Sequence, residues 1–121
     1  MLRVCGPGHI EDRTVSAGCN PYLVFAAYLA AGLDGIDTAA STGEPNFENL
    51  YTLSREEIYK RGLVTLPQSL KEALVALESD NVVLNALGAI KSEFLKLKWQ
   101  EWNEYHRQVS DWEVGHYLTL F

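Results

Sequence analysis

Apolar residues along this chain recur mostly with the period of a helix, and their longest run covers residues 22–33. The run is apolar on almost every side, and it is shorter than the roughly 20 residues that span a bilayer. Asn20 and Pro21 precede it, and these residue types are preferred at an N-cap and at the first helical position. We therefore predict a helix over residues 22–33 that is buried on most sides and whose end is bracketed by Gly32 and Gly35.

Shorter helical patterns follow a loop, residues 37–49, that is rich in Ser, Thr, Gly, Pro and Asn. Ser54 and Glu57 form a capping-box pattern at the start of a short helix. Leu66 is the predicted start of the next helix, and Asp80 is the predicted cap of a short helical turn. In chain order, these later segments are 54–62, one that begins at 66, 80–88, 90–108 and 112–120.

Aromatic residues are concentrated in the last two predicted helices. The apolar stripe of the longer one consists of Leu95, Trp99, Trp102 and Val109. Trp112, Tyr117, Leu118 and Phe121 follow in the last helix. Helical spacing of this kind is more typical of core packing than of a ligand platform, so we expect these side chains to pack in the core.

The N-terminal residues follow the period of a strand instead. Residues 2–5 form a first predicted strand, a Gly-Pro-Gly triplet interrupts it, and residues 10–15 form a second. Because alternate residues of a strand face the same side, Glu11 and Arg13 are expected to point the same way. The predicted fold class is mainly α, with a short extended β segment at the N-terminus. We expect one domain, residues 1–121, with a strand and loop region over 1–19 and a helical region over 20–121.

Composition narrows the classes of function. The 121 residues are 47% hydrophobic and carry a formal net charge of −6, whereas a nucleic-acid-binding protein needs a basic patch. We therefore expect no nucleic-acid partner and no membrane partner. Cys5 and Cys19 do not form a metal-binding pair, and we expect two buried, structural thiols in a reduced, cytoplasmic protein.

Sequence spacing alone also allows non-functional interpretations of the charged residues and the histidines. Glu11 and Arg13 can be an ordinary exposed ion pair, which contributes little stability. His106 and His116 have no partnering cysteine, which argues against a zinc site.

Motifs across the whole chain resemble the C-terminal part of the glutamine synthetase catalytic domain, in the type III or GlnT-like branch. The resemblance begins with Glu11-x-Arg13 followed by Asn20-Pro21-Tyr22-Leu23. It continues through residues 30–36, Asn49-Leu50-Tyr51, Leu66-Pro67-x-Ser69-Leu70, Glu101-Trp102 and residues 109–113. Enzymes of this family join glutamate and ammonia, with a phosphorylated intermediate, using ATP and two magnesium or manganese ions. Some relatives use methylamine or other amines.

The resemblance implies roles for four residues. Glu11 falls at a carboxylate ligand of a metal ion, and oxygen ligands of this kind suit magnesium. Arg13 falls at an arginine that neutralises the transferred phosphate or the glutamate, a role that suits a planar guanidinium. Arg3 matches an arginine near the nucleotide. His9 stands on the nucleotide side where the family commonly has arginine, so a fixed positive charge is lost there.

Most of the family's metal ligands, its ammonia-site acid and its phosphate loop lie upstream of these motifs. We therefore expect the chain to be truncated relative to the family and inactive by itself, with no bound ATP or metal. Its expected partner is a second copy of itself or a glutamine synthetase-type companion chain. The alternative is a non-catalytic helical module for interaction or oligomerisation.

Overall fold

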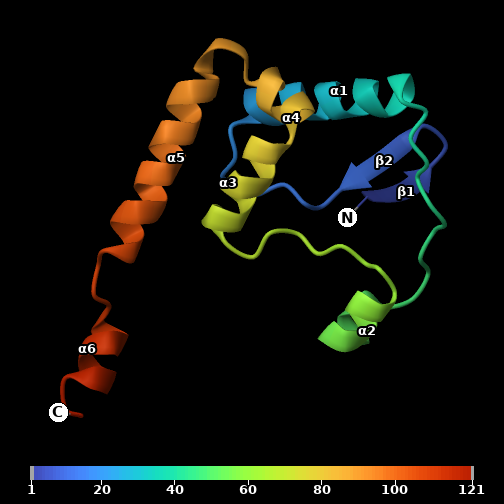
Figure 1. Cartoon of the computed structure of the whole chain (residues 1–121). Helices are drawn as coiled ribbons and strands as arrows, with labels where there is room; N and C mark the ends of the chain where they lie inside the picture. The colour runs from blue at the N-terminus through green and yellow to red at the C-terminus, as the bar shows by residue number, and fades with distance from the viewer. Residues whose placement is uncertain (1, 121) are drawn as a thin grey trace.

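The computed structural model describes residues 2–120. A two-stranded antiparallel hairpin comes first, and helices follow it to the C-terminus (Figure 1). The elements are β1 Leu2–Gly6, β2 His9–Asp12, α1 Pro21–Asp37, η1 Leu50–Thr52, α2 Arg55–Lys60, α3 Leu70–Ser79, α4 Asn81–Ala86, η2 Gly88–Ile90, α5 Lys91–His106 and α6 Asp111–Tyr117. The predicted fold class, mainly α with a short N-terminal β segment, is confirmed.

The hairpin pairs Arg3 with Glu11 and Val4 with Ile10, and its ladder shifts register just before the turn. Since the sheet has two strands over residues 2–120, each strand keeps one edge unpaired in this part of the chain. The second strand is shorter than predicted because it ends at Asp12. There the Asp12 Oδ1 atom accepts a hydrogen bond from the Thr14 backbone N–H at 2.7 Å, a turn that competes with further strand pairing.

Helix α1 begins as its sequence indicates. The Asn20 side chain accepts hydrogen bonds from the backbone N–H groups of Tyr22 and Leu23, and Pro21 is the first helical residue. The predicted end is wrong, because the helix continues through Gly32 and Gly35 to Asp37. Neither glycine has a positive φ, so both act as ordinary, weakly favourable helix residues.

A Schellman motif ends α1. The Ala40 N–H donates to the Gly35 carbonyl and the Ala39 N–H donates to the Ile36 carbonyl. Ala39 has a φ of 50°, in the left-handed region where this motif usually holds glycine. The sequence signal was therefore missed because the residue in the motif is alanine.

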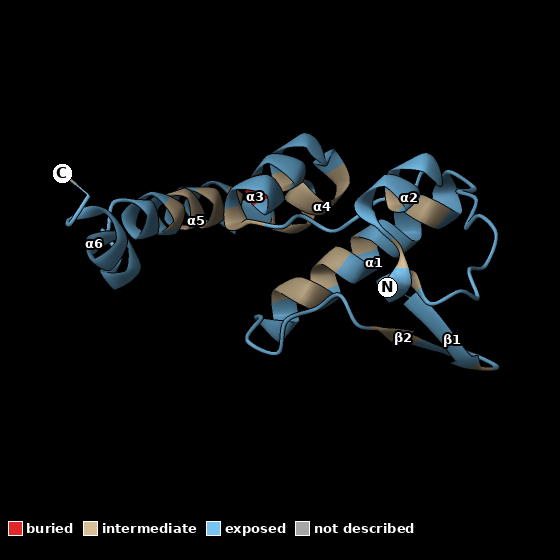
Figure 2. Cartoon of the chain, turned by 90° about the horizontal axis from the view of Figure 1, so that it is seen from below, coloured by how far each residue is buried: buried red, intermediate tan, exposed pale blue. Residues whose placement is uncertain are grey.

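The helices α1, α3, α4 and α5 make the main packing contacts of the chain. Leu74 of α3, 2% exposed, is the one buried hydrophobic residue within residues 2–120, and Figure 2 places most half-buried residues on these helices. The Trp99 Nε1 atom of α5 donates to the Glu78 Oε1 atom at 3.0 Å, which joins α5 to α3. Helix α3 begins at Leu70 and not at Leu66, because Ser69 caps it.

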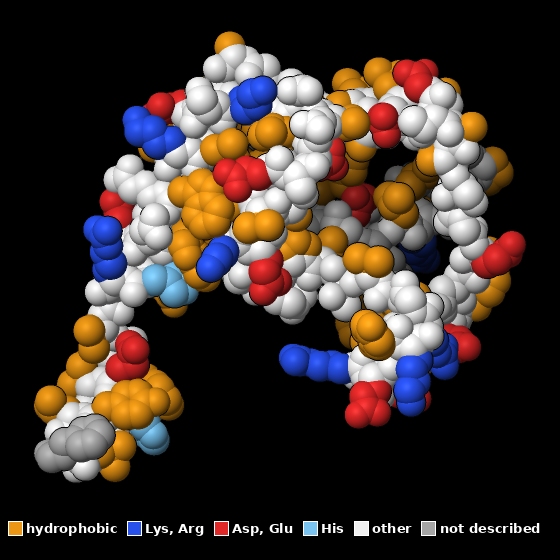
Figure 3. All heavy atoms as spheres, viewed as in Figure 1, with side chains coloured by type: hydrophobic (Ala, Val, Ile, Leu, Met, Phe, Trp, Pro, Cys, Tyr) orange, Lys and Arg blue, Asp and Glu red, His pale blue; other side chains and the backbone are white. Residues whose placement is uncertain are grey.

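Helices α2 and α6 form complete local caps but lie apart from this packing. In α2, Ser54 and Glu57 form the predicted capping box, and Ser110 and Glu113 form another in α6. Helix α6 lies beyond the far end of α5, where apolar side chains gather on the surface (Figures 1 and 3). Trp112 stacks on His116 and is 66% exposed, and Tyr117 and Leu118 are 50% and 75% exposed. The prediction that these three side chains pack in the core is therefore wrong, and Phe121 lies outside the described residues.

The accessible surface is large for the size of the chain. It measures 10595 Å², whereas a compact monomer of 13.5 kDa has about 6,500 Å². Many large hydrophobic side chains are exposed. One face of α1 carries exposed residues spaced three or four apart, here called the α1 stripe: Tyr22, Phe25, Leu29, Leu33 and Ile36. The prediction that α1 is buried on most sides is therefore wrong, because no element within residues 2–120 covers that face.

Over residues 2–120, every helix is too short or too polar to cross a membrane.

Candidate functional site

One face of the hairpin gathers the charged residues singled out by the sequence. Arg3 and Glu11 are register partners, Cys5 lies at the register shift of the ladder, and Arg13 follows the end of β2. The Glu11 Oε1 atom accepts a hydrogen bond from the Arg13 Nε atom at 2.6 Å. Its Oε2 atom accepts one from the Cys5 Sγ atom at 3.4 Å and lies 3.6 Å from Arg3 Nη1. We call these four residues the Glu11 cluster.

The electrostatics of the Glu11 cluster favour an ionised carboxylate. The hydrogen bond from Arg13, and then that from Cys5, lower the pKa of Glu11, and Glu11 raises the pKa of Arg13. Two guanidinium groups therefore surround one carboxylate, which leaves a net positive charge. Side chains of Arg3 and Arg13 are 60% and 65% exposed, so both remain accessible. The cluster suits a phosphate or a carboxylate ligand.

A divalent metal ion does not fit the residues of this chain alone. Within residues 2–120, the structure brings together no group of three His, Cys, Asp or Glu side chains that could hold a metal. Glu11 offers a single carboxylate, and both its oxygens already face cations or a thiol. Magnesium needs near-octahedral oxygen coordination, which residues 2–120 do not complete by themselves.

One predicted site residue, His9, lies outside these contacts. His9 begins β2 two residues before Glu11, on the same face by alternation, and it is exposed. In the described part of the chain it makes no hydrogen bond or ion pair with the Glu11 cluster. Cys5 and Cys19 are both exposed free thiols, so the prediction of two buried cysteines is wrong.

Sequence reasoning missed a second set of contacts next to the Glu11 cluster. The Tyr28 hydroxyl of α1 donates to Asp12 Oδ2, which also accepts from Thr14 Oγ1 at 3.0 Å. The hydrogen bond from Tyr28, followed by that from the Thr14 backbone, lowers the pKa of Asp12 to about 2. The Asp-x-Thr spacing is a local turn signal that could have been found. The contact with Tyr28 crosses 16 residues and has no local signal.

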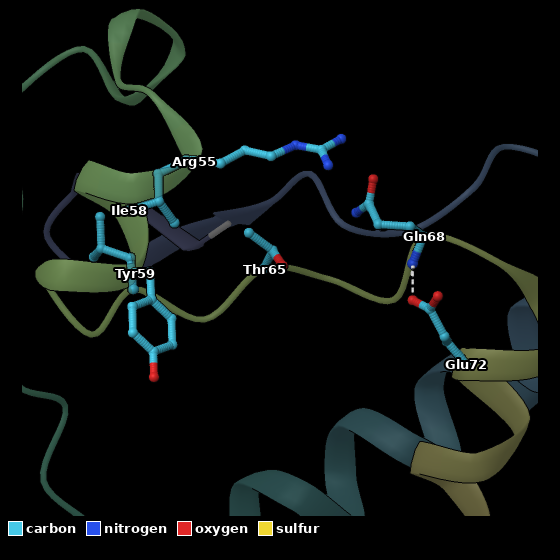
Figure 4. A pocket seen from close by; sticks show the side chains of 7 residues that line it. Arg55, Ile58, Tyr59, Thr65, Gln68 and Glu72 are labelled. Atoms are coloured by element: carbon cyan, nitrogen blue, oxygen red, sulfur yellow. Dashed lines mark hydrogen bonds between the residues drawn. The ribbon is translucent and has the colours of Figure 1, made fainter.

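A cavity lies elsewhere, between α2 and the start of α3 (Figure 4). It measures about 610 Å³ and is lined by Arg55, Ile58, Tyr59, Leu63, Thr65, Gln68 and Glu72. Its one acid, Glu72, accepts a hydrogen bond from the Gln68 backbone N–H at 2.8 Å. No residue of the Glu11 cluster lines this cavity, so the candidate site rests on the charged face of the hairpin.

Comparison with known proteins gives a consistent family. The model of the glutamine synthetase catalytic domain matches residues 1–117. The chain is 49% identical over 121 residues to the glutamate–methylamine ligase of Methyloversatilis universalis, covering 100% of this chain and 27% of that protein. It is 43% identical over 110 residues to the glutamine synthetase of Methanocaldococcus jannaschii, covering 90% of this chain and 24% of that protein.

Solved structures give the same result. A GmaS complex with ADP matches with a TM-score of 0.86 and 39% identity, covering 98% of this chain and 26% of that one. GmaS without ligand matches with a TM-score of 0.80 and 36% identity. The chain thus spans about a quarter of the length of the curated relatives and solved structures that it matches.

Proposed function

The chain belongs to the glutamine synthetase catalytic-domain family, and on this premise we propose that it supplies the C-terminal part of a glutamate–amine ligase site. The observation that carries the proposal is the Glu11 cluster, whose two arginines and one ionised carboxylate lie on one accessible face. In the proposed site, Glu11 gives one carboxylate to a magnesium or manganese ion. Arg13 neutralises the transferred phosphate or the glutamate, and Arg3 and His9 lie toward ATP.

The free chain is inactive in this proposal. One carboxylate does not hold a catalytic metal ion, and phosphoryl transfer depends on positioning and on neutralisation of charge. The missing ligands come from a companion polypeptide of the glutamine synthetase type. The excess of accessible surface, about 4,000 Å² over a compact monomer, supports a large interface with such a companion.

The finer assignments are part of the same proposal. Residues 1–121 act as one domain of the completed enzyme, which belongs to the type III, GlnT-like branch. Its amine is ammonia or a small primary amine such as methylamine. The higher identity to a glutamate–methylamine ligase, 49%, than to the archaeal glutamine synthetase, 43%, supports an amine broader than ammonia.

Reconstitution tests this function. The purified chain is mixed with the M. universalis ligase from which the matching C-terminal residues have been removed, and phosphate release is measured with ATP, glutamate and methylamine. We expect no turnover with either part alone and turnover with both. Glu11→Ala should reduce turnover at least about a hundredfold, as expected for loss of a group that stabilises transition-state charge.

A matched control is Glu44→Ala, which removes an exposed loop carboxylate outside the Glu11 cluster. This variant should keep the activity of the unaltered mixture. Turnover by the free chain that depends on Glu11 would contradict the proposed inactivity. Equal activity of Glu11→Ala and Glu44→Ala in the mixture would contradict the role of the cluster.

A non-catalytic module is the second candidate, and the α1 stripe favours it. Five exposed apolar residues on one helix face can bind another chain without any chemistry. Binding of magnesium-ATP separates the two candidates. The ligase proposal requires that the mixture binds magnesium-ATP and that the affinity falls in Glu11→Ala. A non-catalytic module adds no nucleotide binding, either as the unaltered chain or as Glu11→Ala.

A further inference from the structure

Arg13 of the Glu11 cluster lies just beyond strand β2, which contains its carboxylate partner Glu11. Strand β2 ends at Asp12, so strand pairing fixes Glu11 but not Arg13. The Arg13 side chain is 65% exposed, and its recorded partner in the described residues is Glu11. Packing therefore does little to orient Arg13, and some other contact must set the direction of its backbone.

Asp12 provides one such contact, through hydrogen bonds with Thr14. Its Oδ1 atom accepts from the Thr14 backbone N–H at 2.7 Å and its Oδ2 atom accepts from Thr14 Oγ1 at 3.0 Å. The first bond closes a turn over residues 12–14 with Arg13 at its centre. Such a turn limits the backbone angles of its central residue, so Asp12 limits where the Arg13 side chain can project.

Tyr28 provides a second contact, to the side chain of Asp12. Its hydroxyl donates to Asp12 Oδ2 from within α1, 16 residues away in the sequence. Helix α1 packs in turn against α4. The turn that carries Arg13 is thereby joined to the helical part of the molecule, and its position is no longer set by the hairpin alone.

We propose that Asp12 and Tyr28 are positioning residues that hold Arg13 in place beside Glu11. This proposal rests on the function proposed above, in which Arg13 neutralises the transferred phosphoryl group. A guanidinium that is already held in position needs no reorganisation when that group binds. Asp12 and Tyr28 do not contact the ligand. Their effect passes through the turn and through Arg13.

A nuclear magnetic resonance experiment on the full chain tests the proposal without any ligase activity. The rate at which the Arg13 Nε–H exchanges with water is measured near pH 6, with the signal assigned through its absence in Arg13→Lys. In the unaltered chain, the bond to Glu11 protects this proton. Tyr28→Phe should speed its exchange about threefold to tenfold, the effect expected from loss of one supporting hydrogen bond.

Matched variants separate positioning from general damage. Tyr22→Phe makes the same change in the same helix at an exposed position and should leave the rate unaltered. Asp12→Ala should speed exchange at least as much as Tyr28→Phe, and Asp12→Asn, which keeps an oxygen for the Thr14 N–H, should restore part of the protection. Tyr28→Phe is decisive because it removes one hydroxyl, and the backbone amide shifts of α1 report whether the helix is intact.

Two results overturn the inference: equal exchange rates in Tyr28→Phe and Tyr22→Phe, or full protection in Asp12→Ala. Failure of the proposed function has a different signature. If the reconstituted mixture is inactive while Tyr28→Phe still speeds exchange, the positioning role stands and the ligase role fails. If the mixture is active and the exchange rate is unaltered in both Asp12→Ala and Tyr28→Phe, the ligase role stands and the positioning role fails.

Discussion

At the scale of single residues, Ala39 occupies a backbone conformation that its side chain disfavours. Its φ of 50° lies in the left-handed region, and its Cβ atom costs roughly 1–2 kcal/mol there relative to a right-handed conformation. The Schellman bonds at the end of α1 hold it in place. A residue without a Cβ atom avoids this cost but loses more entropy on folding.

Ala39→Gly is therefore expected to stabilise the chain by about 0.5 kcal/mol, the balance of those two effects. Thermal unfolding followed by circular dichroism at 222 nm measures the change. Ala40→Gly is the matched control, since Ala40 has no positive φ and the new glycine brings only the entropic loss. A lower midpoint for Ala39→Gly than for the unaltered chain would contradict the expectation.

The sequence predicted side-chain contacts between residues that are close in the chain. Alternation predicted that Glu11 and Arg13 meet, and they do, although the strand ends between them. The contact between Asp12 and Tyr28 was not predictable in this way, because its partners come from a strand and from a helix. The roles of these residues toward ATP and metal stay predictions.

At the scale of elements, local caps explain which boundaries the sequence predicts. Asn20, Ser54, Asp80 and Ser110 each accept backbone N–H bonds at the predicted helix starts. Such caps involve residues two or three apart, so a single sequence reveals them. The start of α3 was misplaced because Leu66 begins the apolar pattern while Ser69 provides the cap.

The two capping boxes predict how α2 and α6 respond to acid. Hydrogen bonds from Ser54 and Ser110 lower the pKa values of Glu57 and Glu113 below their ordinary value of 4.5. A carboxyl whose folded pKa is lowered adds stability that is fully present above its unfolded pKa and is lost as pH falls through the folded value. Both helices should therefore fray as the pH falls below about 4.5.

Backbone chemical shifts of α2 and α6 between pH 6 and pH 2.5 measure this fraying. Glu57→Gln removes the titrating group of α2 and should flatten the pH response of that helix, while α6 keeps its own. Each helix thus serves as the control for the other. Unaltered shifts of both helices across the range would contradict the role of the caps.

At the scale of the whole molecule, the exposed apolar surface decides the behaviour of the chain in solution. Sequence patterning predicted that α1 needs apolar neighbours on most sides, and the α1 stripe lacks them here. The error has a physical reason, because periodicity states how much of a helix should be covered but not which polypeptide covers it.

The free chain is accordingly expected to self-associate at micromolar concentration, which light scattering measures. Leu29→Glu places a charge in the middle of the α1 stripe and should shift the population toward monomer. Leu97→Glu, at a position of α5 that is 53% exposed and outside the stripe, should have less effect. A monodisperse monomer of the unaltered chain would contradict self-association through this face.

The two hairpin edges that stay unpaired within residues 2–120 have a consequence for storage of the isolated chain. Each edge presents backbone N–H and C=O groups that any extended segment can pair with, and β1 carries the exposed apolar side chains Leu2 and Val4. Concentrated solutions of the isolated chain would therefore be prone to fibre-like aggregation through these edges.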